Sequence, residues 1–85
     1  MFFTYIIKSK KDGNLYIGYT ANLRKRLKEH NLGLDRATSS RIPFYLVYYE
    51  VYVSKQDAIE REHNLKLRAK ALRQLKNRIR RSLEV

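Results

Sequence analysis

The sequence contains no cysteine, and this absence removes several classes of protein at once. A disulfide scaffold, a thiolate zinc site and a cysteine nucleophile are all excluded. Histidine occurs only as His30 and His63, which excludes a histidine-rich metal cage. The fold must therefore stand on hydrophobic packing, and a chain of 85 residues, 44% of them hydrophobic, can build one small domain of that kind.

Long apolar runs and acidic residues are also scarce. The early apolar stretch at 1–7 is too short to span a bilayer. In a signal peptide basic residues precede the apolar stretch, whereas here the lysines come after it. We therefore expect a cytoplasmic protein with no membrane segment. Eight acidic residues against 19 basic ones give a net charge of +11, which favours a polyanionic partner, nucleic acid before an acidic membrane surface.

The first third of the chain predicts a hairpin followed by a helix. Residues 2–7 and 15–19 are rich in β-branched and aromatic side chains, and Asp12-Gly13 between them is a strong hairpin signal. Thr20 or Asn22 can then cap a helix that carries Leu23 and Leu27 on one face and ends near residue 31.

The rest of the chain predicts a loop, a strand and two helical pieces. Residues 34–42 are polar and read as a surface loop, and residues 44–53 read as a strand with two strictly alternating faces. Ser54 to Asp57 is a capping box that begins a helix, and 66–83 continues helical, with a bend expected near residues 68–70. The order β-β-α-β-α-α predicts an α+β fold, a small three-stranded antiparallel sheet flanked by helices, in a single domain 1–85 with a basic C-terminal helix 68–83.

The acidic residues are few enough to be compared one by one. Turn, loop, helix-cap and terminal positions explain most of them, and Glu50 fits a strand face paired to a neighbouring base. Glu62 is different because it lies on the apolar stripe of its helix between Ala58 and Leu65. A carboxylate there loses hydration unless it is paired or binds a metal. A salt bridge to a nearby lysine or arginine is the commoner explanation, and a metal site is the functional one.

Two further groups of residues have both an ordinary and a functional interpretation. Arg26 and His30 share a helix face and could bind a phosphate and move a proton, or simply form a solvated basic edge. The seven tyrosines and three phenylalanines could be core or could stack on unpaired bases.

Basic residues are concentrated in two segments. The loop carries Arg36 and Arg41, and residues 66–81 hold eight basic side chains and no acid. Such uncompensated charges repel one another unless a polyanion is present. The candidate nucleic-acid-binding residues are Arg36, Arg41, Lys66, Arg68, Lys70, Arg73 and Lys76.

An ordered set of short motifs resembles a known family. The set runs through Thr4-Tyr5, Tyr16-Ile17-Gly18, the segment 26–31 and the segment 57–62. It resembles the GIY-YIG nuclease superfamily, particularly the small stand-alone proteins called URI-domain predicted endonucleases. The same module begins the bacterial nucleotide-excision-repair incision subunit. The first motif departs from the family pattern, since Phe3-Thr4-Tyr5 lacks the glycine and isoleucine, and the family's later asparagine has no clear counterpart.

The resemblance implies a catalytic set and a cofactor. Its members here would be Tyr5, Tyr16, Arg26, His30 and Glu62. The family hydrolyses phosphodiester bonds with one divalent ion, Mg²⁺ or Mn²⁺, which Glu62 would hold. Tyr5 would act as general base, Tyr16 would position water or phosphate, and Arg26 would stabilise the developing charge.

The sequence therefore predicts a metal-dependent DNA endonuclease acting in DNA repair, recombination or other DNA processing. The principal alternative is a non-catalytic nucleic-acid-binding protein on the same fold, and a basic membrane-surface module has only the charge in its favour. The sequence does not distinguish single-stranded, duplex and branched DNA, and it does not indicate an oligomeric state.

Overall fold

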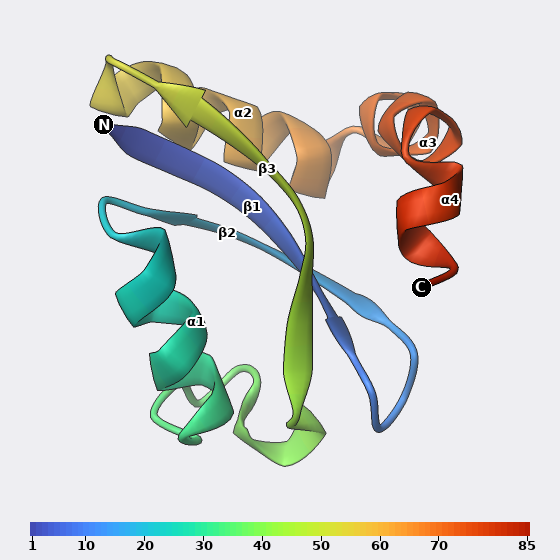
Figure 1. Ribbon diagram of the computed structural model, residues 1–85. Coiled ribbons are helices and arrows are strands. Elements are labelled where there is room, and N and C mark those ends of the chain that lie inside the picture. Colours follow the sequence, from blue (N-terminus) through green and yellow to red (C-terminus); the bar gives the residue numbers. More distant parts are fainter.

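The computed structural model describes all residues 1–85 and contains one antiparallel sheet with helices on both sides (Figure 1). The strands are β1 (Phe2–Ser9), β2 (Leu15–Thr20) and β3 (Phe44–Tyr52), in the spatial order β2-β1-β3. The helices are α1 (Leu23–Asn31), α2 (Lys55–Leu67), α3 (Ala69–Arg78) and α4 (Arg80–Leu83), with a short 3₁₀ turn at Ser39–Arg41. The predicted α+β class and element order are confirmed.

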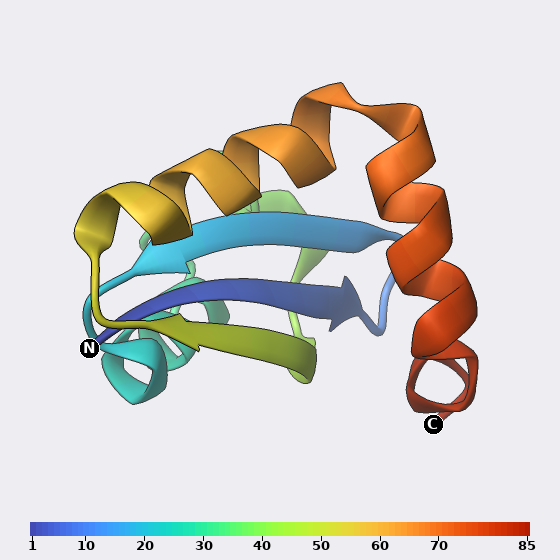
Figure 2. The same cartoon turned by 90° about the horizontal axis from the view of Figure 1, so that it is seen from above.

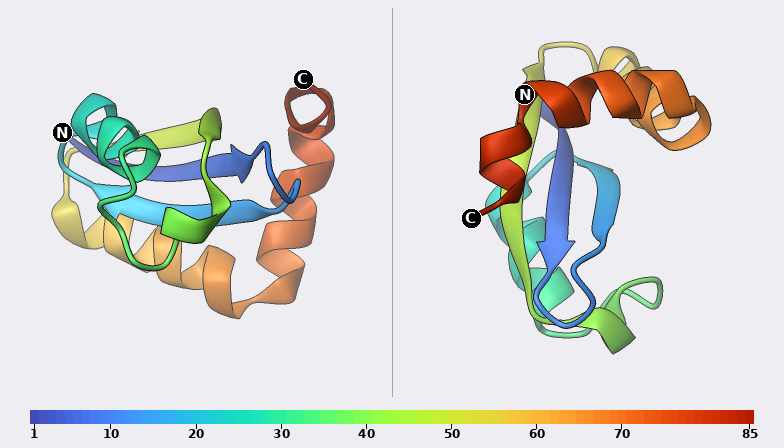
Figure 3. Two further views of the ribbon diagram at one scale, coloured as in Figure 1. Left: turned by 90° about the horizontal axis from the view of Figure 1, so that it is seen from below. Right: turned by 90° about the vertical axis from the view of Figure 1, so that its right-hand side faces the viewer.

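The central strand β1 separates two clusters of buried side chains. Tyr5 and Ile7 face α1 and pack with Phe44, Leu23 and Leu27. The opposite face of the sheet packs against α2 and α3, through the cluster Ile6, Ile17, Leu65, Leu75 and Ile79. Figure 3 shows α1 on one side of the strands, and Figure 2 shows α2 running along the other side.

Strand β3 differs from the strict alternation that its sequence predicts. Ile6 pairs with Tyr48 and Ile7 pairs with Leu46, so Val47 is an extra residue on β3. A bulge of this kind shifts the side-chain alternation by one position. Val47 and Tyr48 therefore pack against the same cluster, the one under α2 and α3.

The C-terminal segment is not one helix over 68–83. Arg68 is extended, with φ −116° and ψ 100°, and separates α2 from α3 near the expected bend. A second break falls at Ile79, which is buried and lies between α3 and α4. The two breaks let α3 and α4 cross the end of the sheet where the β1–β2 hairpin turns (Figure 2). No helix in the chain is long and apolar enough to cross a membrane.

Candidate active site

The β1–β2 ladder places two tyrosines of the predicted set on one face of the sheet. Tyr5 is the cross-strand partner of Gly18, and Ile7 is the partner of Tyr16. Cross-strand partners share a face and residues two apart share a face, so Tyr5, Tyr16 and Gly18 all point toward α1. Gly18 has no side chain, which leaves room over its backbone for the Tyr5 ring.

Helix α1 brings His30 onto this face of the sheet. The helix begins where the Asn22 side chain accepts a hydrogen bond from the Lys25 amide. The His30 ring is fully buried and meets the Tyr5 and Tyr16 rings edge-on, at centroid distances of 5.9 and 5.3 Å. Its Nε2 lies 2.7 Å from the Tyr5 hydroxyl, which places both groups in one hydrogen bond.

The segment between α1 and β3 completes this arrangement, which the sequence had not indicated. The Thr38 side chain is fully buried, and its hydroxyl lies 2.8 Å from His30 Nδ1. Tyr5, His30 and Thr38 thus form a continuous buried hydrogen-bonded line. The sequence prediction of a surface loop is wrong for Thr38, because its hydroxyl satisfies a buried ring nitrogen that water cannot reach.

Asp35 in the same segment holds Arg26. The two side chains form a salt bridge, and Glu29 adds a second contact to Arg26 at 3.3 Å. Arg26 keeps 27% of its side chain exposed, so the guanidinium is oriented yet still open to a ligand. In the sequence, Asp35 looks like an ordinary loop residue. Its carboxylate accepts a hydrogen bond from the Ala37 amide, and aspartates form such turns in many loops, so this pattern does not indicate a partner for Arg26.

Burial determines the protonation of this cluster. Burial raises the pKa of Tyr5 to about 12, although the neighbouring Arg26 acts to lower it. Burial, together with the positive charge of Arg26, lowers the pKa of His30. Near neutral pH the hydroxyl and the imidazole are therefore both uncharged, and the imidazole is free to accept a proton through one of its nitrogens.

Glu62 approaches the site from the other layer of the fold, at the edge of the sheet. Lys66 connects the two sides: its Nζ lies 3.1 Å from Glu62 Oε2 and 5.6 Å from the centre of the Tyr16 ring. Because β2 is an edge strand, a side chain on α2 can reach around it to Tyr16. The salt-bridge interpretation of Glu62 is therefore what the structure shows. The pair is not sealed, since 40% of the Lys66 side chain is exposed.

Comparison with known proteins identifies the family. The chain matches the GIY-YIG catalytic domain over residues 1–80. The protein belongs to the GIY-YIG nuclease superfamily. It is 42% identical over 79 residues to UPF0213 proteins of Staphylococcus aureus strains Mu3 and Mu50, covering 89% of this chain and 95% of each relative. The solution NMR structure of a UPF0213 protein from Bacillus halodurans has a similar fold, with 36% identity, a TM-score of 0.54, and coverage of 88% of this chain and 82% of that one. A GIY-YIG nuclease domain implies a nucleic acid substrate.

GIY-YIG nucleases generally use divalent metals, and the residues at this edge can be compared with that requirement. No cluster of three or more His, Cys, Asp or Glu side chains is present. Glu62 is a single carboxylate with 16% of its side chain exposed, and His63 Nε2 lies 3.9 Å from its Oε1. Mg²⁺ is often held by one or two carboxylates with waters and substrate phosphate. Glu62 fits an ion of this kind, provided that Lys66 gives up its carboxylate contact.

Glu50, the acidic residue on β3, has a structural role in this protein. Arg61 donates to it at 3.0–3.2 Å, and the hydroxyls of Tyr48 and Tyr52 donate to it as well. Burial acts to raise the pKa of Glu50, but these hydrogen bonds together hold it below its usual range. The prediction that Glu50 is paired on a strand face is confirmed.

The predicted nucleic-acid-binding residues fall into two groups in the structure. Arg36 in the loop and the residues of α2–α3 are exposed, namely Lys66, Arg68, Lys70, Arg73 and Lys76. Arg41 is engaged within the protein: its Nε donates to Asp12 at 2.7 Å, and its guanidinium lies over the Phe44 ring at 5.3 Å. Arg41 thus joins the loop to the hairpin turn.

Proposed function

We propose that the protein is a divalent-metal-dependent endonuclease that hydrolyses phosphodiester bonds in DNA. The observation that carries this proposal is the buried line from Tyr5 through His30 to Thr38, beside the partly exposed Arg26. Buried polar networks cost free energy unless every member is satisfied, and they occur often at sites that move protons. The family membership makes phosphodiester hydrolysis the reaction to consider.

In this proposal Tyr5 and His30 act together as the proton acceptor. A tyrosine of pKa about 12 is almost never ionised at neutral pH, so Tyr5 alone is a weak base. Tyr5 is buried in the free protein, so substrate binding must open its hydroxyl to the attacking water. As Tyr5 then takes a proton from that water, its own hydroxyl proton passes to His30 Nε2. The tautomer that permits this transfer has its hydrogen on Nδ1, which then donates to Thr38.

Arg26 and Glu62 serve the phosphate in this proposal. Arg26 donates to the non-bridging oxygens, and its ion pairs with Asp35 and Glu29 keep it in place before substrate arrives. Glu62 would hold the divalent ion, which when bound would supply charge stabilisation at the phosphate and the leaving oxygen. Lys66, released from Glu62, moves to a neighbouring phosphate. Tyr16, beside Lys66 and His30, positions the phosphate or the water.

One observation favours the alternative of a binding protein without catalysis. Lys66 already neutralises Glu62, and a lone carboxylate held in this way needs no metal. This alternative predicts tight DNA binding that is independent of divalent ions.

The decisive experiment compares cleavage by the unaltered protein and by Glu62→Gln. Labelled single-stranded, duplex and branched DNA is incubated with Mg²⁺, with Mn²⁺ or with chelator, and binding is measured in parallel by fluorescence anisotropy. We expect Glu62→Gln to bind DNA but to cut it about 100-fold more slowly. Glu60→Gln, an exposed carboxylate on the same helix, is the matched control and should cut normally. Equal cutting by both variants would refute the role of Glu62, and binding without cutting in every arm would establish the alternative.

A further inference from the structure

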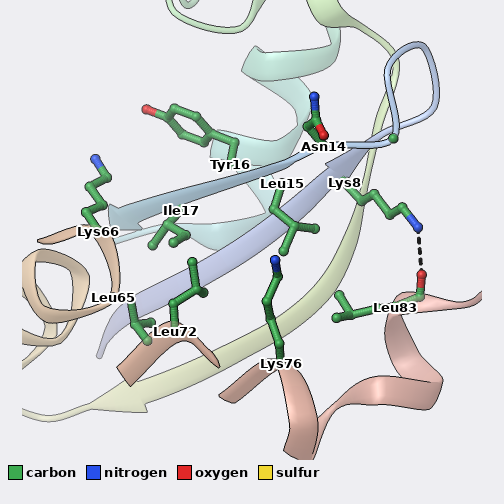
Figure 4. Close-up of a pocket in the computed structure, with 11 residues that line it drawn as sticks. Lys8, Asn14, Leu15, Tyr16, Ile17, Leu65, Lys66, Leu72, Lys76 and Leu83 are labelled. Carbon is green, nitrogen blue, oxygen red and sulfur yellow. Dashed lines mark hydrogen bonds between the residues drawn. The ribbon is translucent and has the colours of Figure 1, made fainter. Parts of the chain in front are cut away.

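An open cavity of about 540 Å³ adjoins the candidate active site on the α2–α3 side of the sheet (Figure 4). It lies where the β1–β2 hairpin, the end of α2, and the helices α3 and α4 meet. Its volume is in the range of small-molecule binding sites, roughly 300–1,000 Å³. It is large enough for one nucleotide.

The lining of this cavity has two chemical parts. One is aliphatic: Leu15, Leu72 and Leu83 are half-buried there, next to Ile17 and Leu65 of the buried core. The other is cationic and consists of Lys8, Lys66 and Lys76, with no acidic residue in the lining. Lys8 donates to the Leu83 carbonyl at 2.7 Å and so ties α4 to the sheet. The exposed ammonium of Lys76 is left for a ligand, and Lys66, whose side chain is 40% exposed, can share its ammonium between Glu62 and a ligand.

The cavity shares two residues with the site described above. Tyr16 and Lys66 line it, and Lys66 also contacts Glu62. In Figure 4 the Lys66 side chain extends from α2 toward Tyr16, and Lys76 extends from α3 toward the strands. A group in this cavity is therefore a neighbour of any phosphate held near Glu62.

We propose that the cavity binds an unpaired nucleotide adjacent to the phosphate that is cleaved. The base lies against the aliphatic side chains, and its phosphate is bound by Lys66 and Lys76. Phosphates alone would need only the lysines, whereas the half-buried Leu15, Leu72 and Leu83 offer an apolar surface for a base that has left its stack. A base held in a duplex cannot enter, so the preferred substrate is single-stranded or locally unpaired nucleic acid.

This inference rests on the proposed function for the position of the cleaved phosphate, but it can be tested without cleavage. Anisotropy is measured in chelator with three probes of equal length: a single strand, the matching blunt duplex, and a single strand of abasic sites. We expect the single strand to bind about tenfold more tightly than both other probes. Equal binding of the abasic strand would overturn the inference, because its phosphates are unchanged.

Lys76→Ala tests the place of binding, with Lys70→Ala as control. Both lysines are exposed on α3, and only Lys76 lines the cavity. We expect Lys76→Ala to weaken single-strand binding severalfold and to reduce the preference over the abasic strand. Lys70→Ala should weaken all three probes equally. Identical behaviour of the two variants would contradict the placement of the nucleotide in this cavity.

RNA strands measured in parallel show which sugar is accepted. Base-dependent binding without any cleavage would support this inference while refuting the proposed function.

Discussion

A Cβ atom at position 18 would overlap both Cζ and the hydroxyl oxygen of Tyr5. The aromatic ring therefore covers the backbone of its cross-strand partner, and only glycine permits that approach. This contact gives a steric reason for the glycine of the Tyr16-Ile17-Gly18 motif: it leaves the space in which Tyr5 reaches His30.

Gly18→Ala should displace the Tyr5 ring. We expect a loss of about 1–3 kcal/mol in the free energy of unfolding, measured in urea, from overpacking of a filled site. Cleavage should be lost as well, because the hydroxyl leaves His30. Gly13→Ala is the comparison. A Cβ atom added at Gly13 would meet no atom within 4 Å, so the substitution destabilises the protein only through the positive φ of +73°, and cleavage should persist. A fully active Gly18→Ala protein would disprove the spatial argument.

The pH dependence of cleavage should follow His30. The pKa of His30 lies below 6.5 because burial and then Arg26 disfavour its charged form. The neutral ring predominates above that pKa and is lost as the pH falls through it, so the rate should decline about tenfold per unit of acidification. His30→Gln should cut slowly, with a flat acid limb in the pH profile. His63→Gln should keep the acid limb, and an unchanged profile in His30→Gln would exclude the proton-acceptor role.

Asp35→Asn should impair Arg26 without unfolding the loop. The amide can still accept from the Ala37 backbone but carries no charge for Arg26. Cleavage should slow about tenfold while DNA binding changes little, which single-turnover rates and anisotropy can separate. Asp57→Asn, at an exposed helix start, serves as control. A change in binding alone would indicate that Arg26 holds DNA rather than the reacting phosphate.

Acid stability should also depend on Asp35. Burial acts to raise its pKa, but the Ala37 amide and Arg26 lower it overall. A carboxyl with a lowered pKa stabilises the fold above its ordinary pKa of about 4, and this contribution is lost as the pH falls toward the folded value. The stability gap between the unaltered protein and Asp35→Asn should therefore narrow below pH of about 4. Urea unfolding at a series of pH values measures the gap, and a constant gap would contradict the assignment.

The two loop arginines should behave differently. Arg41→Ala removes the side chain that covers Phe44 and should cost about 1 kcal/mol of stability. Arg36→Ala removes an exposed charge, so it should leave the free energy of unfolding unchanged. It should reduce the slope of log binding constant against log salt concentration by about one. Thermal unfolding and salt titrations distinguish the two outcomes. Weaker DNA binding by Arg41→Ala, with unaltered stability, would instead show that Arg41 contacts DNA.

Local signals predicted most of the elements correctly. Asp12-Gly13 placed the hairpin, Asn22 capped α1, and Ser54 capped α2, because each acts within a few residues of itself. Thr38 and Asp35 could not be predicted in the same way, since their partners His30 and Arg26 lie on a helix eight and nine residues away. The link between Lys66 and Tyr16 depends on which strand lies at the edge of the sheet, and no local pattern encodes that order.

The strand that carries Tyr5 is also the one with no exposed face. Residues Thr4 to Ile7 are all buried, and β1 pairs with a strand on each side. Their amides can exchange with solvent only when a neighbouring strand detaches, which for β3 means breaking a pairing between Phe2 and Tyr52, fifty positions apart. Slow hydrogen exchange in β1 would therefore report on the whole fold, and Tyr5 would be held by a backbone that opens only when the sheet comes apart.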